Sequence, residues 1–368
     1  MKTASLVIFF VNIFFSSGII MSQSDHKPLK VGVVGLTHTH VHWILGRPER
    51  GDIEIVGIVE PNRDLAQRYS DQHGYSMEIV FESMEEMIDE VKPEAVTAFG
   101  SIYEHLEVVE KCAPLGIHVM VEKPLAVNLL HAKKMKELAE KHNIHLLTNY
   151  ETSWYATNHK TYKMLHEGEI GDLRKVVVLD GHKGPIELGI NQEFLDWLTD
   201  PILNGGGALT DFGCYGANLI TWLTKGKMPN SVFAITQTIK PDLYPKVDDE
   251  ATIILKYPKM QGIIQASWNW PISRKDMEVY GKTGYIISEN RSDLRYRLSE
   301  DDKEEIKKIK ELESPHDDPF VLFASVIRGQ TILQSYDLSS LENNMIVMEI
   351  LEAAKESANS GKVVELKN

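Results

Sequence analysis

Short apolar runs alternate with amphipathic stretches over the first part of the chain. The apolar runs are typical of buried strands and occupy residues 30–35, 53–61, 93–100, 117–124 and 144–150. The stretches between them have helical spacing and occupy residues 39–49, 62–74, 83–91, 103–116 and 128–143. Strands separated by helices of this length pair in parallel. The pattern therefore predicts an α/β fold over residues 28–150, with a doubly wound parallel sheet of the dinucleotide-binding (Rossmann) type.

The second part of the chain is richer in strands. Strand patterns occupy residues 173–182, 231–240, 250–257, 261–270, 275–284 and 285–290. Few helices lie between them, although residues 154–168, 208–226 and 339–361 have helical spacing. This order predicts an open, mostly antiparallel sheet with helices on one face. We therefore expect residues 151–368 to form an α+β domain for substrate binding and oligomerisation. We assign Trp268 and Trp270 to sheet packing or to a subunit interface.

Composition excludes several classes of function. The 368 residues are 43% hydrophobic and 25% charged, as in soluble globular proteins. A net charge of −14 argues against a nucleic-acid partner, because phosphate binding needs clustered Lys and Arg. With Cys112 and Cys214 as the two cysteines, neither a disulfide framework nor a cysteine-based metal site is expected.

Residues 1–21 have the order of a secretory signal peptide. Lys2 precedes an apolar run from Leu6 to Phe15, and small residues follow it. The run is too short for a comfortable membrane span, so we expect no stable membrane span. These features predict an exported, periplasmic protein. The alternative is a true start at Met21, which would leave the protein in the cytoplasm.

The stretch from Gly35 to His40 follows the first predicted strand, where a dinucleotide fingerprint would lie. Thr37 and His40 stand where G-x-G-x-x-G has its second and third glycines. Gly35 permits the sharp turn, and Thr37 is small enough to cap the following helix. Glu60 ends the second strand, where an acid binds ribose hydroxyls and favours NAD over NADP, although the nearby Arg63 weakens that preference. A plain strand–turn–helix connection remains the alternative for this motif alone.

Two further stretches place reactive side chains at predicted ligand sites. Glu122-Lys123-Pro124 follows a buried strand, so Lys123 is presented at the carboxyl end of the sheet, where α/β proteins bind ligands. Three consecutive glycines then precede a predicted helix that carries Asp211 and Tyr215. These two residues are four positions apart and share a helix face.

Together these stretches resemble the Gfo/Idh/MocA oxidoreductases, a family that includes inositol dehydrogenases and glucose–fructose oxidoreductases. The resemblance rests on the first turn, on E-K-P, and on G-G-G-A-L-x-D-x-G-x-Y, and it extends over the chain after the leader. It implies Lys123, Asp211 and Tyr215 as the catalytic residues. A phenol is a poor base at neutral pH, so we expect Lys123 to lower the pKa of Tyr215 and Asp211 to orient the site.

The resemblance, together with the chemistry of the side chains, suggests two sets of binding residues. Trp154 and His182 are included because aromatic faces and polar donors suit pyranosides, and plain packing and loop charge remain the alternative for them. The residues expected to bind NAD, with NADP possible, are Gly35, Thr37, His38, His40, Glu60, Ser101, His105, Glu122, Lys123 and Asn149. Those expected to bind a carbohydrate are Lys123, Trp154, His182, Asp211 and Tyr215.

The run Thr37-His38-Thr39-His40-Val41-His42 contains more histidines than such a turn needs. On an extended strand alternate histidines could bind a metal together, but on a helix they point apart. The helix-start location therefore predicts no metal, and His38 or His40 is expected to cap the turn, contact the pyrophosphate or reach the substrate.

These observations predict an NAD(P)-dependent oxidoreductase that transfers hydride between nicotinamide and a hydroxyl or carbonyl of a sugar, glycoside or polyol. Export would favour a tightly bound cofactor that is regenerated on the enzyme, because free NAD pools are cytosolic. The alternatives are a catalytically silent nucleotide- or sugar-binding protein on the same fold and a metal hydrolase that uses the histidine run. We expect a homodimer or homotetramer, since the open second sheet needs a cover.

Overall fold

The computed structural model describes residues 27–366, and the predicted signal peptide lies outside the described residues. Six parallel strands form the first sheet in the order β3-β2-β1-β4-β5-β6, as the Rossmann prediction requires. The strands are β1 Leu29–Val34, β2 Ile53–Val59, β3 Val80–Phe81, β4 Ala95–Ala98, β5 His118–Glu122 and β6 Leu146–Asn149. Their connections carry helices α1 Val41–Leu45, α2 Arg63–His73, α3 Met84–Val91, α4 His105–Cys112 and α5 Leu129–His142.

Capping interactions set the ends of these helices. The Asn62 side chain accepts the backbone N–H of Leu65 at the start of α2, and Gly74 ends that helix with φ of 80°. Ser83 caps α3 in the same way. The first helix is the exception, because α1 has only five residues and His40 at its N-cap makes no side-chain cap. The expectation that Thr37 caps this helix is therefore wrong.

The second sheet has nine strands, in the order β14-β13-β12-β11-β7-β10-β9-β8-β15, and every pair is antiparallel except β7 with β10. The strands are β7 Lys175–Gly181, β8 Ser231–Gln237, β9 Glu250–Lys256, β10 Gln261–Ser267, β11 Arg274–Tyr280, β12 Tyr285–Ser288, β13 Asp293–Arg297, β14 Glu305–Lys308 and β15 Val364–Glu365. The accompanying helices are α6 Ala156–His166, α7 Pro185–Leu188, α8 Gln192–Leu198, α9 Ala208–Asp211, α10 Gly213–Leu223, α11 Pro319–Ile327 and α12 Leu341–Ser360.

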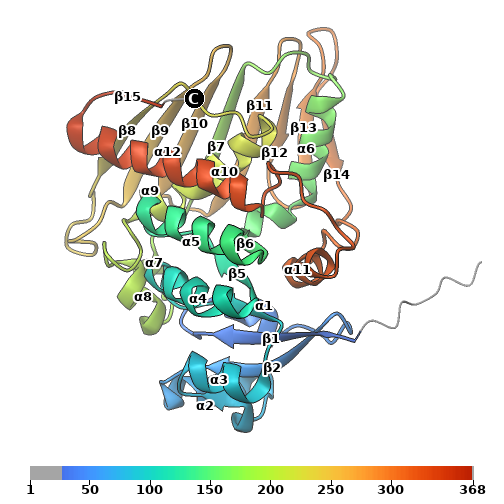
Figure 1. Ribbon diagram of the computed structural model, residues 1–368. Coiled ribbons are helices and arrows are strands. Elements are labelled where there is room, and N and C mark those ends of the chain that lie inside the picture. The colour runs from blue at the N-terminus through green and yellow to red at the C-terminus, as the bar shows by residue number, and fades with distance from the viewer. Residues whose placement is uncertain (1–26, 367–368) are drawn as a thin grey trace, which may run out of the picture.

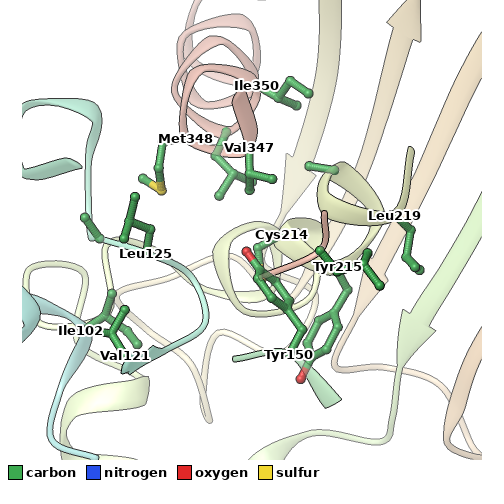
Figure 2. Packing of buried hydrophobic residues seen from close by; sticks show 14 of the residues in the cluster. Ile102, Val121, Leu125, Tyr150, Cys214, Tyr215, Leu219, Val347, Met348 and Ile350 are labelled. Atoms are coloured by element: carbon green, nitrogen blue, oxygen red, sulfur yellow. The ribbon is translucent and has the colours of Figure 1, made fainter. Parts of the chain in front are cut away.

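Helices α10 and α12 cover one face of this second sheet (Figure 1). Residues of these helices and of the sheet share one buried core. This core also contains Tyr150 and Tyr215, which Figure 2 shows next to one another. Helix α11 instead packs on the first sheet, where Phe320 and Phe323 join the core of β1 and β2. Among residues 27–366, none of the helices combines the length and hydropathy needed to cross a bilayer.

Candidate active site

Lys123 and Asp211 form a buried ion pair between the two sheets. Lys123 follows β5, and Asp211 ends α9. The Lys123 ammonium contacts the Asp211 carboxylate and also donates to the Asp211 backbone carbonyl at 3.1 Å. Burial alone would lower the pKa of Lys123, but the attraction of Asp211 outweighs it and raises that pKa. The same attraction lowers the pKa of Asp211 despite burial. Both groups are therefore charged at neutral pH.

The second carboxylate oxygen of Asp211 is held by Trp268. The indole Nε1–H donates to it at 3.0 Å, and Trp268 is fully buried. This bond fixes the orientation of the carboxylate, so Trp268 has a positioning role that its assignment to sheet packing missed. The expected single helix over residues 208–226 is interrupted at Phe212. Asp211 and Tyr215 nevertheless both lie beside Lys123.

Tyr215 is enclosed by charged groups and by a second tyrosine. Its ring lies edge-on to Tyr150, with 5.5 Å between centroids, and the Lys123 ammonium is 5.1 Å from its centroid. Burial, followed by the negative charge of Glu151, raises the pKa of Tyr215 well above its ordinary value. The expectation that Lys123 lowers this pKa is therefore wrong, because the ammonium is paired with Asp211 and faces the ring. Tyr215 is a phenol, and hence a proton donor, at neutral pH.

A second ammonium, that of Lys275 on β11, also lies beside Tyr215. Its Nζ is 4.6 Å from the ring centroid and 3.5 Å from the phenol oxygen, and it is paired with Glu151. Lys275, Glu151, Tyr155 and His182 line a pocket of about 660 Å³. Of the residues predicted to bind carbohydrate, His182 therefore borders this pocket, and burial lowers its pKa to about 4.

Trp154 lies elsewhere. Its indole is buried in the core beneath the first sheet, and its N–H donates to Asn149 at 3.0 Å. Asn149 in turn donates to Glu122 at 2.8 Å. Trp154 does not line the pocket that Lys275 and His182 border. The structure thus places Trp154 as a support for Asn149 and Glu122.

The turn after β1 is tightly bonded. Gly35 has φ of 78°, and a Cβ there would lie 2.7 Å from the backbone nitrogen of Gly100, so only glycine fits. The Thr37 hydroxyl is 3.4 Å from the carbonyl of Phe99 and accepts the Trp197 indole N–H at 3.1 Å. Trp197 belongs to α8, a helix missing from the sequence prediction. Helix α8 therefore covers this turn and ties the two parts of the chain together.

The pocket beside this turn has a volume of about 410 Å³ and is lined in part by Gly35, Thr37, Glu60 and His105. The buried Glu60 carboxylate accepts the backbone N–H groups of Leu36 at 3.0 Å and Asn62 at 2.9 Å. Each of its oxygens retains a lone pair for a ribose hydroxyl.

Ser101 makes its hydrogen bonds within its own turn. Its backbone N–H and its hydroxyl both bond the Glu104 carboxylate, at 2.6 and 2.8 Å. The Arg63 guanidinium donates to the carbonyl of Val80 at 3.2 Å. The structure therefore shows both side chains in contacts within the first domain.

His38 and His40 lie together in the turn before α1, with 4.5 Å between ring centroids. The expectation that they point apart is wrong, because neither is inside the helix. His40 contacts Glu122 at 2.9 Å, whereas His42 on α1 contacts His73 at 2.8 Å.

Donor atoms of His38, His40 and Glu122 lie within 4.8 Å of one another, close enough to hold a metal ion. However, His38 Nδ1 accepts the backbone N–H of His40 at 3.0 Å. The neutral ring then carries its proton on Nε2 and has no lone pair there for a metal. The hydrogen bonding of this turn therefore disfavours a metal.

Two buried ring nitrogens suit a dinucleotide better. His38 Nε2–H and His105 Nε2 are buried and have no partner among the described residues. His105 Nδ1 donates to the carbonyl of Leu125 at 3.1 Å, so its Nε2 is an acceptor. A ribose hydroxyl both donates and accepts, and Glu60 offers further acceptors. The residues present thus fit the ribose hydroxyls of a bound dinucleotide.

Family comparisons agree with this geometry. Residues 29–150 match the model of the oxidoreductase family with an NAD-binding Rossmann fold, and residues 159–287 match that of the GFO/IDH/MocA C-terminal domain. The chain belongs to the GFO/IDH/MocA oxidoreductase family. Its first domain is accordingly the NAD-binding domain of that family.

Individual relatives are distant. A trans-1,2-dihydrobenzene-1,2-diol dehydrogenase of Xenopus tropicalis is 26% identical over 219 residues, which are 59% of this chain and 61% of that protein. A myo-inositol 2-dehydrogenase of Thermotoga maritima is 23% identical over 266 residues, 71% of this chain and 75% of that protein. The chain thus matches about three fifths of the length of the frog enzyme.

Solved structures share the fold over nearly the whole chain. An aldose-aldose oxidoreductase from Caulobacter crescentus, complexed with glycerol, has a TM-score of 0.77 at 20% identity, covering 92% of this chain and 100% of that one. An inositol dehydrogenase homolog from Azotobacter vinelandii, complexed with NAD+, has a TM-score of 0.78 at 17% identity, covering 92% and 98%.

Proposed function

We propose that this chain is an NAD-dependent oxidoreductase acting on a hydroxyl or carbonyl group of a sugar, glycoside or polyol. The observation that carries the proposal is the buried Lys123–Asp211 pair beside Tyr215, at the carboxyl end of the NAD-binding sheet. The names of the relatives support the substrate class, since they include an inositol dehydrogenase and an aldose oxidoreductase.

The site residues have distinct roles in this proposal. Gly35, Glu60, His38 and His105 would hold the cofactor, which supplies or accepts the hydride when bound. The Lys123 ammonium would donate a hydrogen bond to the reacting oxygen and stabilise negative charge there. In the reduction direction the Tyr215 phenol would deliver a proton to that oxygen. In the oxidation direction Tyr215 must first lose its proton, so we expect oxidation to accelerate as the pH rises.

The test uses residues 22–368 incubated with NAD+ and, separately, with glucose, methyl glucoside or myo-inositol, while the absorbance of NADH is followed. Lys123→Met and Tyr215→Phe are expected to lower kcat by about 10²–10⁴-fold. Tyr257→Phe is the matched control, because this buried tyrosine lies away from both pockets. Unchanged turnover in Lys123→Met would contradict the proposal. Binding of NAD+ and sugar without turnover by the unmodified chain would instead favour the catalytically silent binding protein.

We further propose that residues 1–21 direct export and that the cofactor stays bound through a redox-neutral cycle. In such a cycle one substrate is oxidised and another carbonyl is reduced on the same enzyme. Mass spectrometry of small molecules released on denaturation should find about one NAD per chain. A protein purified without cofactor would argue against retention, and full-length chain in the cytosol would argue against export.

The outer face of the second sheet supports a homodimer or homotetramer. Ile235 on β8 is 55% exposed and Ile254 on β9 is 38% exposed, and Phe233 lies directly opposite Ile254 in the ladder. Apolar side chains at this density favour a covered face. Light scattering should give the mass of an oligomer for the unmodified chain and a lower mass for Ile254→Glu. A monomer in both cases would contradict the assembly.

A further inference from the structure

Asp180 on β7 is a buried carboxyl group that the proposed mechanism does not yet use. It is 1% exposed, and neither of its oxygens has a hydrogen-bond partner among residues 27–366. An ionised carboxylate left in this way carries a large desolvation penalty, whereas a protonated acid carries much less. Burial accordingly raises the pKa of Asp180 well above its ordinary value.

The strand register places Asp180 directly beside Lys275. Strands β7 and β11 are antiparallel neighbours, and Lys275 pairs with Asp180 in the ladder. Side chains at paired positions emerge on the same face with Cβ atoms about 4.5–5.5 Å apart. Lys275 in turn lies 3.5 Å from the phenol oxygen of Tyr215. Lys275 thus has Asp180 as its neighbour in the strand ladder and Tyr215 at its ammonium group.

The surroundings of Lys275 favour different protonation states for two neighbouring carboxyl groups, those of Glu151 and Asp180. Glu151 takes the ion pair, and Lys275 holds its pKa at about 2 although burial alone would raise it. Asp180 is left without a counterion. Two carboxyl groups whose surroundings separate their pKa values in this way are suited to opposite roles, one as a fixed charge and the other as a proton donor.

We propose that Asp180 is the proton reservoir of the active site and acts on Tyr215 through Lys275. The proposal rests on the function proposed above. In carbonyl reduction, bound NADH would supply the hydride to the carbonyl carbon, and the Tyr215 O–H proton would pass to the carbonyl oxygen. The phenolate then takes a proton from the Lys275 ammonium, and the resulting amine takes the carboxylic proton of Asp180. Asp180 ends as a carboxylate beside an ammonium, and solvent in the pocket next to Lys275 returns its proton.

The ionisation of Asp180 can be measured without any substrate. Infrared difference spectra at neutral pH should show the carbonyl stretch of a protonated carboxylic acid in the unmodified protein and lose it in Asp180→Asn. Asp293→Asn is the matched control, because this partly exposed carboxylate on β13 is paired with Lys308 and its pKa is lowered by hydrogen bonds from Asn290 and Lys308. Identical spectra for the unmodified protein and Asp180→Asn would overturn the proposal.

The relay itself is tested by NADH-dependent reduction of an aldose. Lys275→Arg keeps a positive charge beside Glu151, but a guanidinium cannot give up its proton. Lys275→Arg should therefore lower kcat about as far as Lys275→Met, by about 10²-fold or more, with little change in KM. If Lys275→Arg retained the unmodified kcat, charge alone would explain the role of Lys275 and the relay would be refuted.

The pH profile separates Asp180 from a purely structural role. The rate of reduction by the unmodified enzyme should fall as the pH rises and Asp180 loses its proton. Asp180→Asn should be slow throughout this pH range, and its rate should not show this fall. The other titratable groups that act on Asp180, or feel its charge, are Lys123, Glu151, Asp211, Cys214, Tyr155, Tyr215 and Lys275. Because the pKa of Tyr215 lies well above its ordinary value of about 10, loss of its own proton slows reduction only at higher pH, and it does so in both proteins. A decline below about pH 10 that persists in Asp180→Asn would assign the titration to one of the other groups and overturn the proposal. Absence of turnover in the unmodified enzyme would refute the proposed function and the relay together, while the infrared band would still report the acid form of Asp180.

Discussion

Replacing Asp211 with asparagine tests the central ion pair. The side chains of Lys123 and Asp211 are 6% and 7% exposed, so water screens their interaction weakly. Asp211→Asn leaves the Lys123 ammonium buried without a counterion, and breaking a buried pair in this way costs about 3–5 kcal/mol of the free energy of unfolding. Urea denaturation of the unmodified protein and the variant at neutral pH measures this cost. A loss below about 1 kcal/mol, the range of surface pairs, would refute the reasoning.

The double variant Lys123→Met/Asp211→Asn isolates the interaction. Removing both charges leaves no unpaired ammonium, so it should cost less than the sum of the two single variants. Glu85→Gln is the control, because Glu85 is 60% exposed in its pair with Lys111 and its loss should cost no more than about 1 kcal/mol. Strict additivity of the two buried substitutions would show that they do not interact.

Three further predictions follow from other contacts. Gly207→Ala should lower Tm in a thermal melt, because the added Cβ would lie 1.8 Å from the carbonyl oxygen of Asp248. Thr37→Val should cost about 1–3 kcal/mol in urea unfolding, since the buried Trp197 N–H loses its acceptor. Glu122 has its pKa lowered to about 2, against the effect of burial, chiefly by His40. Its stabilisation is therefore full above the unfolded pKa of about 4.3 and is lost as pH falls towards 2. Unfolding free energies measured across this window should fall less steeply in Glu122→Gln; equal slopes would contradict the assignment.

The first sheet could be predicted from sequence because each of its main strands is an apolar run bounded by a helix signal such as Asn62 or Ser83. Strand β3 escaped prediction because two residues give no periodicity. Helix α8 also escaped: its apolar residues Phe194 and Trp197 face the turn of the first domain, a contact that exists only in the folded chain.

The candidate site likewise contains residues that the sequence could predict and residues that it could not. Lys123, Asp211 and Tyr215 could be predicted because they lie in motifs of fixed spacing. Lys275 and Asp180 lie in ordinary alternating strands, and only the pairing of β7 with β11 brings them to Tyr215. The expected pKa shift of Tyr215 had the wrong sign because sequence does not show that Lys123 is already paired.

Helix α11 has a consequence for when the core of the first sheet can be completed. Phe320 and Phe323 complete the core beside β1 and β2, although they are synthesised long after the six strands of that sheet. The core on this face of the first sheet also contains residues of α1 and α2, so α11 adds only its last part. That core is therefore complete only after residue 323 has been synthesised.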